Sequence, residues 1–533
     1  MKKILLWIVF LSQLVLYSQQ VTPVTDWIKS YKDAEAKPIN ASCYIMGDSN
    51  YIYFSGGIGR TDRTAYFTLS KISPEGDQTT LAEYETLPDA TDGAGNLVID
   101  SENNIYAAGS TNYGGSKTKP LVLKFSPSGE LLWKDNFNNI KEQTTSAVDI
   151  KLFNKSAAAV LYNSLDTFHD YAIVKGYSTQ GDSLWSVKLQ DDTSRYSAKY
   201  LVSDNSGFIY AVVVQIYNLS QQFTSADFQV LKINSAGEVI WKKSLGDFNP
   251  DNAIMDRENN LILISQSGPV KKINSLGEIL WTYTDEASSS IYIYYNGAAD
   301  SGNNLFITGG IFLARGWCDY IITKLAPGGS KIWSASFNSE ENLTDFAKYA
   351  AVDNEGSIYV SGESEDTDSN GPCYVVKYSS AGEFQWKYKL HPDNSNETYA
   401  LGIFTDDSSN VYVGGNSRDA VNNSGYILAK IKQTQSVGVE EQNIIPAENK
   451  LEQNYPNPFN PSTLIKYTVA KAGIVTIKIY DILGNEIKTL VNEYKTPGVY
   501  SIEFSSQNLA SGIYIYNMSS LGFRSGRKMI IIK

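Results

Sequence analysis

The sequence predicts an all-β protein that contains a β-propeller of about eight blades, closed by an N-terminal strand, and a small C-terminal antiparallel β-sandwich. Three observations lead to this prediction. Two motifs alternate along most of the chain with a period typical of propeller blades. A strand that the last repeat lacks is found before the first repeat. In the final 80 or so residues, apolar and polar residues alternate as in half-buried strands.

Residues 1–18 have the pattern of a signal peptide. A short positive region at residues 1–3 precedes an apolar stretch from Ile4 to Tyr17, and Ser18 offers a small residue before Gln19. The apolar stretch is too short for a membrane span, and no later segment approaches the roughly 20 apolar residues that a span needs. We therefore expect cleavage near Ser18 and an exported mature chain without a transmembrane span.

The first motif is an acidic or polar turn that leads into a short strand of β-branched and aromatic residues. Such a turn followed by such a strand is the local pattern of a β-hairpin element. Strong copies and four weaker ones are spaced mostly 50 to 54 residues apart. They begin at Asp100, Asp204, Asp300 and Asp353, and at Asp48, Asn154, Asp256 and Asp406.

The second motif follows the first by about 25 residues and places a glycine four residues before a tryptophan. Glycine supplies the positive φ that a tight connection between two strands requires. Each repeat therefore has about four strands, and such a sheet buries both faces only by stacking against its neighbours. The six pairs are Gly129/Trp133, Gly181/Trp185, Gly237/Trp241, Gly277/Trp281, Gly329/Trp333 and Gly382/Trp386.

The ends of the repeat region predict how the ring closes. The last repeat stops after Tyr426 to Ile431 without a tryptophan strand, and the segment Trp27 to Tyr31 has the spacing of that missing strand. Pairing it into the last blade removes an open sheet edge. We predict a propeller over residues 25–432, with seven blades as the alternative if one weak copy is only a loop. We interpret seven tryptophans as blade-packing residues: Trp27, Trp133, Trp185, Trp241, Trp281, Trp333 and Trp386.

The two motifs, Asp-x-x-x-Asn-Ile-Tyr-x-x-Gly and Lys-x-Ser-x-x-Gly-Glu-x-x-Trp, resemble the bacterial β-propeller repeat family (SBBP) and are similar in pattern to quinoprotein-like propellers. The resemblance covers roughly residues 25–432. It implies an exported scaffold with no single activity attached.

Residues 433–449 are polar and free of aromatic residues, which predicts a linker, and residues 450–533 form the predicted sandwich. Strands are expected at 462–469, 474–480, 498–504, 512–516 and 528–533. Three motifs in this module closely resemble the type A sorting domain of the type IX secretion system. The matching residues are Asn454, Tyr455, Pro456, Asn457, Pro458, Phe459, Asn460 and Pro461, then Asp481 and Gly484, then Gly512 and Lys528.

The resemblance to a sorting domain implies a destination and a partner. It implies passage through the outer membrane of a Bacteroidota-like bacterium, recognition by the type IX machinery, and often removal of the domain with release or attachment to surface lipopolysaccharide. The expected location is the cell surface or the extracellular space. A sandwich that serves only as an accessory domain is the alternative, because prolines and a turn glycine suit any such sandwich.

Charge and cysteine usage exclude several classes of protein. The net charge is −12, while residues 450–533 carry ten Lys/Arg against five Asp/Glu, so the rest of the chain is strongly acidic. An acidic body argues against nucleic acid as a partner. Cys43, Cys318 and Cys373 are too few and too far apart for a disulfide framework or a zinc site. We expect buried free thiols, with one Cys318–Cys373 bridge as the alternative.

Catalytic and cofactor signatures are poorly represented, so no catalytic or cofactor-binding residue is assigned. His169 and His391 stand in unlike contexts, and no nucleophile-elbow or P-loop motif occurs. Asp366, Asp368 and Asn370 imitate the opening of a calcium loop, but Lys377 stands where the closing glutamate belongs. A solvated loop is the main interpretation and calcium the alternative. An active quinoprotein is not expected, because packing explains the tryptophans.

Two functions are therefore predicted. The first is a non-enzymatic surface or secreted module that binds glycan or protein through propeller loops, where Tyr113, Tyr217 and Tyr294 are expected. The second is an exported enzyme that acts on polysaccharide with two or more carboxylates at one channel mouth. The recurring Tyr53, Tyr106, Tyr210, Tyr359 and Tyr412 are expected in the core instead.

Overall fold

A computed structural model of the chain describes most residues from Val21 to Ile532. The described ranges are 21–31, 39–59, 65–87, 90–113, 117–135, 144–153, 157–165, 170–191, 193–220, 223–266, 268–285, 291–312, 317–340, 343–365, 371–391, 395–419, 424–435, 449–454, 456–471, 473–495, 498–506 and 509–532. The predicted signal peptide, most of the predicted linker, and the predicted calcium loop lie outside these ranges.

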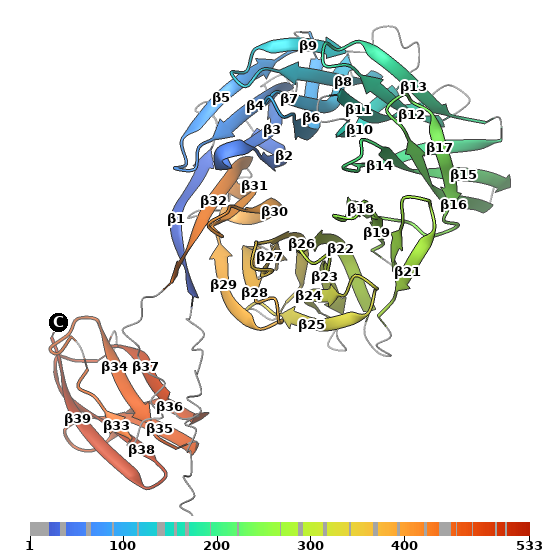
Figure 1. Cartoon of the computed structure of the whole chain (residues 1–533). Coiled ribbons are helices and arrows are strands. Elements are labelled where there is room, and N and C mark those ends of the chain that lie inside the picture. The colour runs from blue at the N-terminus through green and yellow to red at the C-terminus, as the bar shows by residue number, and fades with distance from the viewer. Residues whose placement is uncertain are drawn as a thin grey trace, which may run out of the picture. The chain divides into compact units, whose positions relative to one another are not determined.

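The first unit, Gln20–Thr434, consists of four-stranded antiparallel groups arranged around a central axis (Figure 1). In each group, consecutive strands pair with one another, and we name a blade by its first and last strands. The first four blades contain β2 (Ile39–Met46), β3 (Ile52–Gly59), β4 (Ala65–Ile72), β5 (Gln78–Tyr84); β6 (Ala90–Ile99), β7 (Ile105–Tyr113), β8 (Lys117–Phe125), β9 (Leu131–Asp135); β10 (Thr144–Phe153), β11 (Ala157–Leu165), β12 (Asp170–Tyr177), β13 (Ser183–Leu189); β14 (Ser194–Ser203), β15 (Ile209–Ser220), β16 (Phe223–Ile233) and β17 (Val239–Ser244).

The following blades repeat the same order of strands. They contain β18 (Asn252–Met255), β19 (Leu261–Ile264), β20 (Val270–Ile273), β21 (Ile279–Tyr283); β22 (Ile291–Ala299), β23 (Leu305–Phe312), β24 (Cys318–Leu325), β25 (Lys331–Phe337); β26 (Asp345–Val352), β27 (Ile358–Ser364), β28 (Cys373–Tyr378), β29 (Phe384–Leu390); and β30 (Ser395–Thr405), β31 (Val411–Asp419), β32 (Ser424–Gln435). One short 3₁₀ turn, η1 (Asp48–Asn50), joins β2 to β3.

The last sheet is closed by the N-terminal strand β1 (Val21–Tyr31), which pairs with β32 to give the order β1-β32-β31-β30. The strand that contains Trp27 therefore completes the final blade, as its spacing predicted. The blades β2–β5 and β6–β9 share one sheet through a single parallel pair, Ala65 with Thr91. The all-β propeller prediction is confirmed, while eight as the number of blades stays a prediction.

The hydrophobic core lies between neighbouring blades. One cluster joins Tyr359, Val375 and Trp386 of blade β26–β29 to Val413 and Ile427 of the last sheet, and all five side chains are buried. Burial of apolar surface between stacked sheets is the main stabilising term of such a fold. The recurring tyrosines are part of this core, since Tyr53, Tyr106, Tyr210, Tyr359 and Tyr412 are all buried.

The second unit contains two sheets that share one core. The three-stranded sheet has the order β33-β34-β37, and the four-stranded sheet has the order β36-β35-β38-β39. Side chains of both sheets, such as Ile465 and Ile477, meet in one buried cluster, so the sheets pack face to face. The strands are β33 (Lys450–Leu451), β34 (Ser462–Val469), β35 (Gly473–Tyr480), β36 (Glu486–Lys495), β37 (Gly498–Ser505), β38 (Gly512–Ser520) and β39 (Phe523–Ile531). Strands β33 and β36 were not predicted from the sequence.

Candidate functional site

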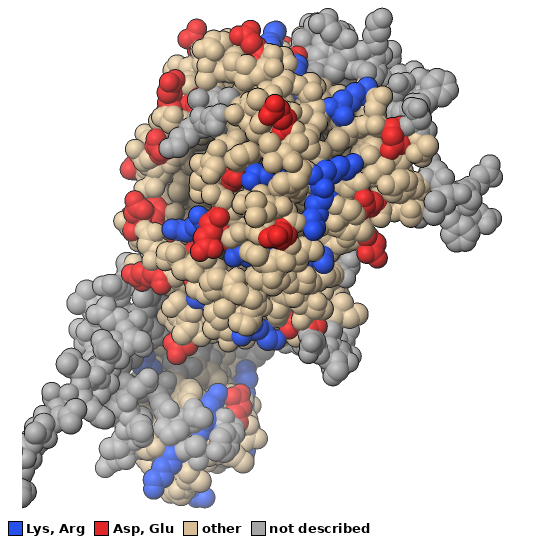
Figure 2. All heavy atoms as spheres, turned by 45° about the vertical axis from the view of Figure 1, so that its right-hand side comes forward, with Lys and Arg blue, Asp and Glu red and all other residues tan. Residues whose placement is uncertain are grey.

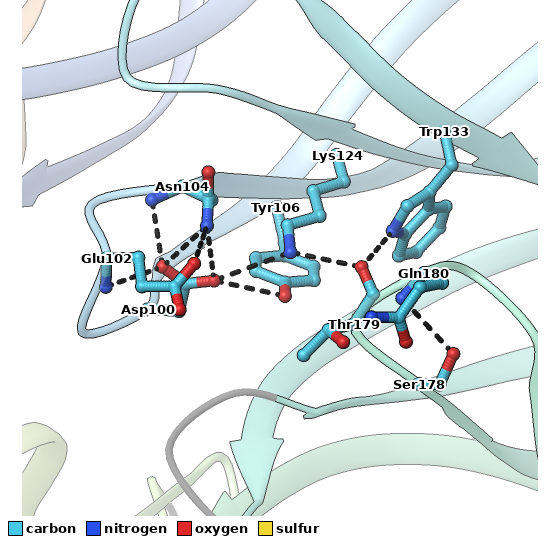
Figure 3. A network of polar contacts seen from close by, with 9 residues as sticks. All are labelled: Asp100, Glu102, Asn104, Tyr106, Lys124, Trp133, Ser178, Thr179 and Gln180. Atoms are coloured by element: carbon cyan, nitrogen blue, oxygen red, sulfur yellow. Dashed lines mark hydrogen bonds and ion pairs between the residues drawn. The ribbon is translucent and has the colours of Figure 1, made fainter.

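A buried polar network explains the two repeated motifs (Figure 3). Asp100, in the turn between β6 and β7, accepts hydrogen bonds from the backbone N–H of Asn104 at 2.8 Å and from the Tyr106 hydroxyl at 3.2 Å. Its carboxylate lies 3.6 Å from the Lys124 ammonium in β8. Burial alone would raise the pKa of Asp100, but the Asn104 hydrogen bonds and the Lys124 charge hold it below its usual value.

The same network reaches into the next blade. Lys124 and Trp133 both donate to the backbone carbonyl of Thr179, at 3.1 Å and 3.0 Å. Thr179 lies in the turn between β12 and β13, and Gly181 of that turn has φ +91°. A Cβ on Gly181 would lie 2.7 Å from the Trp133 ring, so this position requires glycine for both its backbone and its contact. The two motifs therefore join one blade to the next.

The tryptophan-to-carbonyl contact recurs around the ring. In each case the acceptor belongs to the turn before the last strand of the following blade, and the distances are 2.9–3.1 Å. The contacts are Trp27 to Pro74, Trp185 to Ser235, Trp241 to Ser275, Trp281 to Pro327 and Trp333 to Ser380. Trp386 differs, because β1 supplies the last strand of the following blade and no such turn exists there. Its indole N–H is buried without an acceptor in the described residues.

A cleft between blade β26–β29 and the last blade is the candidate ligand site of the propeller. It has a volume of about 230 Å³, and we call it the acidic cleft. It lies where β26 and β30 begin and where β27 ends. Its lining residues are Thr344, Phe346, Glu363, Ser364, Glu365, Gly371, Glu397, Thr398 and Tyr399.

The carboxylates of the acidic cleft differ in their partners. Glu397 accepts hydrogen bonds from the Tyr399 hydroxyl and, at 3.1 Å, from Arg418. Among the residues that the structure describes, the ion pair of Glu363 is a long contact of 3.9 Å with Lys348. Burial and then the hydrogen bond to Glu397 raise the pKa of Tyr399 to about 12, so its hydroxyl stays protonated and can donate at neutral pH. The cleft thus combines acceptor oxygens, hydroxyl groups and two aromatic rings.

Sequence reasoning missed this cleft, although a signal existed. In the first motif the residue after the glycine is Ser110, Gly310 and Asn416 in three repeats, and Glu363 departs from that pattern. The predicted calcium residues Asp366, Asp368 and Asn370 connect Glu365 to Gly371 in the sequence and lie outside the described residues. Within the described ranges, no group of three or more His, Cys, Asp and Glu side chains could hold a metal ion.

Other predicted residues are found in different places. The expectation that Tyr294 is an exposed loop residue is wrong, because it lies in β22, is buried, and donates to Asp285 at 2.5 Å. Tyr113 and Tyr217 also lie in strands, β7 and β15. Cys318 and Cys373 are buried free thiols. His391 follows β29 and is exposed, and His169 lies outside the described residues.

In the C-terminal unit, the proline-rich motif holds the last strand. Asn457 accepts a hydrogen bond from the backbone of Ile530 at 2.8 Å, and the backbone of Phe459 pairs with β39 on both sides of Ile531. Asn454 is buried and donates to the Thr463 hydroxyl at 2.9 Å. Tyr455 lies outside the described residues. Pro456, Pro458, Asn460 and Pro461 belong to the same segment, which spans both sheets.

The second motif forms the turn between β35 and β36. Asp481 accepts from the backbone N–H groups of Leu483 at 2.8 Å and Asn485 at 2.9 Å, and Gly484 has φ +86°. Gly512 begins β38, and Lys528 lies in β39, where its carbonyl accepts from Asn457.

The visible face in Figure 2 carries acidic and basic side chains side by side over the described residues, rather than one continuous basic field. In the part of the chain that the structure describes, no helix is long and apolar enough to cross a membrane.

Comparison with known proteins identifies the C-terminal module. Residues 453–533 match the family described as secretion system C-terminal sorting domain. The match confirms the predicted sorting domain and marks the chain for export by type IX secretion to the cell surface or the extracellular space. No curated protein matches the chain.

Solved structures that resemble the chain include β-propellers. The Dos1 propeller is 11% identical over 75% of this chain and 95% of its own, with a TM-score of 0.46. The extracellular domain of the hybrid two-component system BT3049 from B. thetaiotaomicron is 10% identical over 92% and 72%, with a TM-score of 0.34. An ulvan lyase of polysaccharide lyase family PL25 is 8% identical over 73% and 93%, with a TM-score of 0.41. At these scores the likenesses carry no argument about activity.

Proposed function

We propose that this protein is a surface or secreted binding module, which its C-terminal domain delivers across the outer membrane and whose propeller binds one sugar unit of a glycan in the acidic cleft. The observation that carries the proposal is the composition of that cleft. Glu363, Glu365 and Glu397 offer acceptors for sugar hydroxyls, and Phe346 and Tyr399 contribute aromatic rings to the lining, which suit the apolar side of a sugar.

The size of the cleft supports a single sugar unit. Its 230 Å³ falls below the range of about 300–1,000 Å³ that is typical of sites for drug-sized ligands. Neutral and amino sugars fit best, because three carboxylates repel an anionic sugar while the two nearby cations, Lys348 and Arg418, are already paired with Glu363 and Glu397.

The test is a binding screen of the mature full-length chain against a panel of neutral, amino and acidic glycans, followed by variants. Glu397→Gln and Tyr399→Ala are each expected to weaken binding of the selected glycan by about tenfold, the effect of one lost hydrogen bond to a charged group or one ring contact. Glu130→Gln, an exposed glutamate in a turn of blade β6–β9, is the matched control. Binding that Glu397→Gln and Tyr399→Ala leave unchanged would refute the site.

A second candidate function is an enzyme that acts on polysaccharide, and the presence of three carboxylates in one cleft favours it. The two candidates differ in one readout. An enzyme releases new reducing ends from the glycan that it binds, and Glu363→Gln or Glu397→Gln abolishes the release, whereas a binding module leaves the glycan intact.

A further inference from the structure

Two large aliphatic side chains project into solvent from one turn of the sorting module. Ile482 is 72% exposed and Leu483 is 82% exposed, and both lie at the tip of the β35–β36 hairpin. Leu483 is the most exposed large apolar residue among those that the structure describes. Exposure of adjacent apolar side chains is unfavourable in water, and this pair is more exposed than adjacent apolar pairs of the propeller such as Val239 and Ile240, at 43% and 50%.

Hydrogen bonds within the turn hold the backbone that carries this pair. The Asp481 carboxylate accepts from two backbone N–H groups, and its second oxygen accepts from the Asn485 side chain at 2.8 Å. The backbone N–H of Gly484 donates to the carbonyl of Asp481 at 3.1 Å. These bonds fix the direction in which Ile482 and Leu483 point, so a partner would not have to order the turn on binding.

The backbone of this turn does not require apolar side chains, as the propeller itself demonstrates. Six propeller turns have the same hydrogen bonds to an aspartate carboxylate. Each also has a residue with positive φ three positions after the aspartate. The Asn274-centred turn of the propeller has Leu276, which is 74% exposed, at the position that corresponds to Leu483. In all six Asp-centred turns, the two positions that correspond to Ile482 and Leu483 have polar residues or glycine. These pairs are Ser101/Glu102, Asn205/Ser206, Arg257/Glu258, Ser301/Gly302, Asn354/Glu355 and Asp407/Ser408.

We propose that the Ile482–Leu483 tip is the contact by which a protein component of the secretion machinery binds the sorting module, with both side chains in an apolar pocket of that protein. The proposal rests on the sorting function of residues 453–533. Adjacent aliphatic anchors in a pocket are a common energetic centre of protein interfaces. The exposed Lys488 beside the turn and the excess of basic residues in the module fit a pocket with an acidic rim.

A lipid surface fits the tip less well than a protein pocket. Two short aliphatic side chains bury far less hydrocarbon than even a single acyl chain, which by itself gives only marginal membrane binding.

The experiment follows export of the full-length chain in a host with a type IX system. Ile482→Ser combined with Leu483→Glu gives this turn the same two side chains that follow Asp100 in the propeller. Because the Asp100 turn forms with those side chains, the variant turn should form as well. The matched control is Ile474→Ser, which removes an aliphatic side chain that is 64% exposed on β35 of the same module. Thermal unfolding of each purified chain reports folding, and immunoblots of medium, cell surface and periplasm report location.

We expect the double variant to fold normally and to show at least about tenfold less protein at the surface and in the medium, with periplasmic accumulation, because two apolar anchors are lost. Ile474→Ser is exported normally. Normal export of the double variant overturns the proposal. So does a second result, in which the wild-type chain sediments with anionic phosphatidylglycerol vesicles and the double variant does not. A chain that ends at Gln435 distinguishes failure of the sorting function from failure of the Ile482–Leu483 contact. If its export is also normal, the sorting function itself has failed.

Discussion

The indole of Trp27 lies over Gly76, and its Nε1 donates to the carbonyl of Pro74 at 3.0 Å. The N-terminal strand is therefore bonded to the blade β2–β5. A Cβ on Gly76, whose φ is +88°, would lie 2.9 Å from the Trp27 ring. The contact repeats, at the point of closure, the arrangement that joins Trp133 to Gly181.

The first prediction concerns Gly76. Gly76→Ala adds both backbone strain and a clash with Trp27, so we expect it to lower the free energy of unfolding by about 2–3 kcal/mol. Gly246 has φ +66°, and a Cβ added there would meet nothing within 4 Å, so Gly246→Ala should cost only about 1 kcal/mol. Denaturant unfolding of both variants measures the difference. Equal losses in the free energy of unfolding would show that the Trp27 contact does not contribute to stability.

The second prediction concerns the tryptophan without an acceptor. Trp133→Phe removes the hydrogen bond to Thr179 and should cost about 1 kcal/mol more than Trp386→Phe, since the Trp386 N–H is buried and unpaired within the described part of the chain. Lys377, beside Trp386, donates instead to the side chain of Gln433 at 2.7 Å, which takes the place of the missing turn carbonyl. Unfolding by denaturant compares the two variants, and a larger loss for Trp386→Phe would contradict the assignment.

The third prediction concerns buried ion pairs. Asp256 and Lys272 lie 2.7 Å apart and are almost wholly buried, so Lys272→Met leaves a buried carboxylate and should cost about 3–5 kcal/mol. Adding Asp256→Asn should restore much of that loss. Lys387 and Glu340 also lie 2.7 Å apart but are exposed, so Lys387→Met should cost less than about 1 kcal/mol. Similar losses for the two lysine variants would be inconsistent with this view.

The same carboxylate makes stability depend on pH. Burial alone would raise the pKa of Asp256, but the Lys272 and Asn260 hydrogen bonds hold it below its ordinary value of 3.8. A carboxylate whose pKa is lower in the folded state contributes stability that is present above the unfolded-state pKa and is lost as the pH falls through the folded-state pKa. We therefore expect melting temperature to fall below about pH 4. The fall should be smaller in Asp256→Asn, and an identical fall would count against this role.

A fifth prediction concerns the proline-rich motif. Asn454 is buried, and its side-chain amide donates to the Pro456 carbonyl and the Thr463 hydroxyl, so Asn454→Ala removes two hydrogen bonds inside the C-terminal unit. We expect a loss of about 2 kcal/mol in the unfolding of this unit. Hydrogen exchange of β34 and β38 amides in the full chain measures it, with propeller amides as an internal control. Unchanged exchange in β34 and β38 would contradict the role of the motif.

The fold could be predicted from the sequence because its signals are local and repeated. Glycine and tryptophan recur at fixed spacing, and spacing alone identifies the strand of Trp27. The partner of each tryptophan could not be identified in this way, because Trp133 contacts Gly181 of the next blade rather than its own Gly129. That contact depends on how two blades stack, which no single repeat encodes.

The acidic cleft could not be assembled from the sequence, because Glu363 and Glu397 come from different blades and meet only when these stack. Tyr294 was misplaced for a related reason. Its segment follows a serine run, which is typical of a loop, but β22 extends from Ile291 and turns the side chain toward Asp285 and Thr323. The sorting motif was readable, since its residues are adjacent in the sequence.

The C-terminal module directs export, and the location of the chain in its native host tests this role most directly. The measurement compares the wild-type chain with one that ends at Gln435, by fractionation and intact mass. We predict wild-type protein at the surface or in the medium and the shortened chain in the periplasm with a folded propeller. Shortened protein that reaches the surface as efficiently as the wild type would contradict the account.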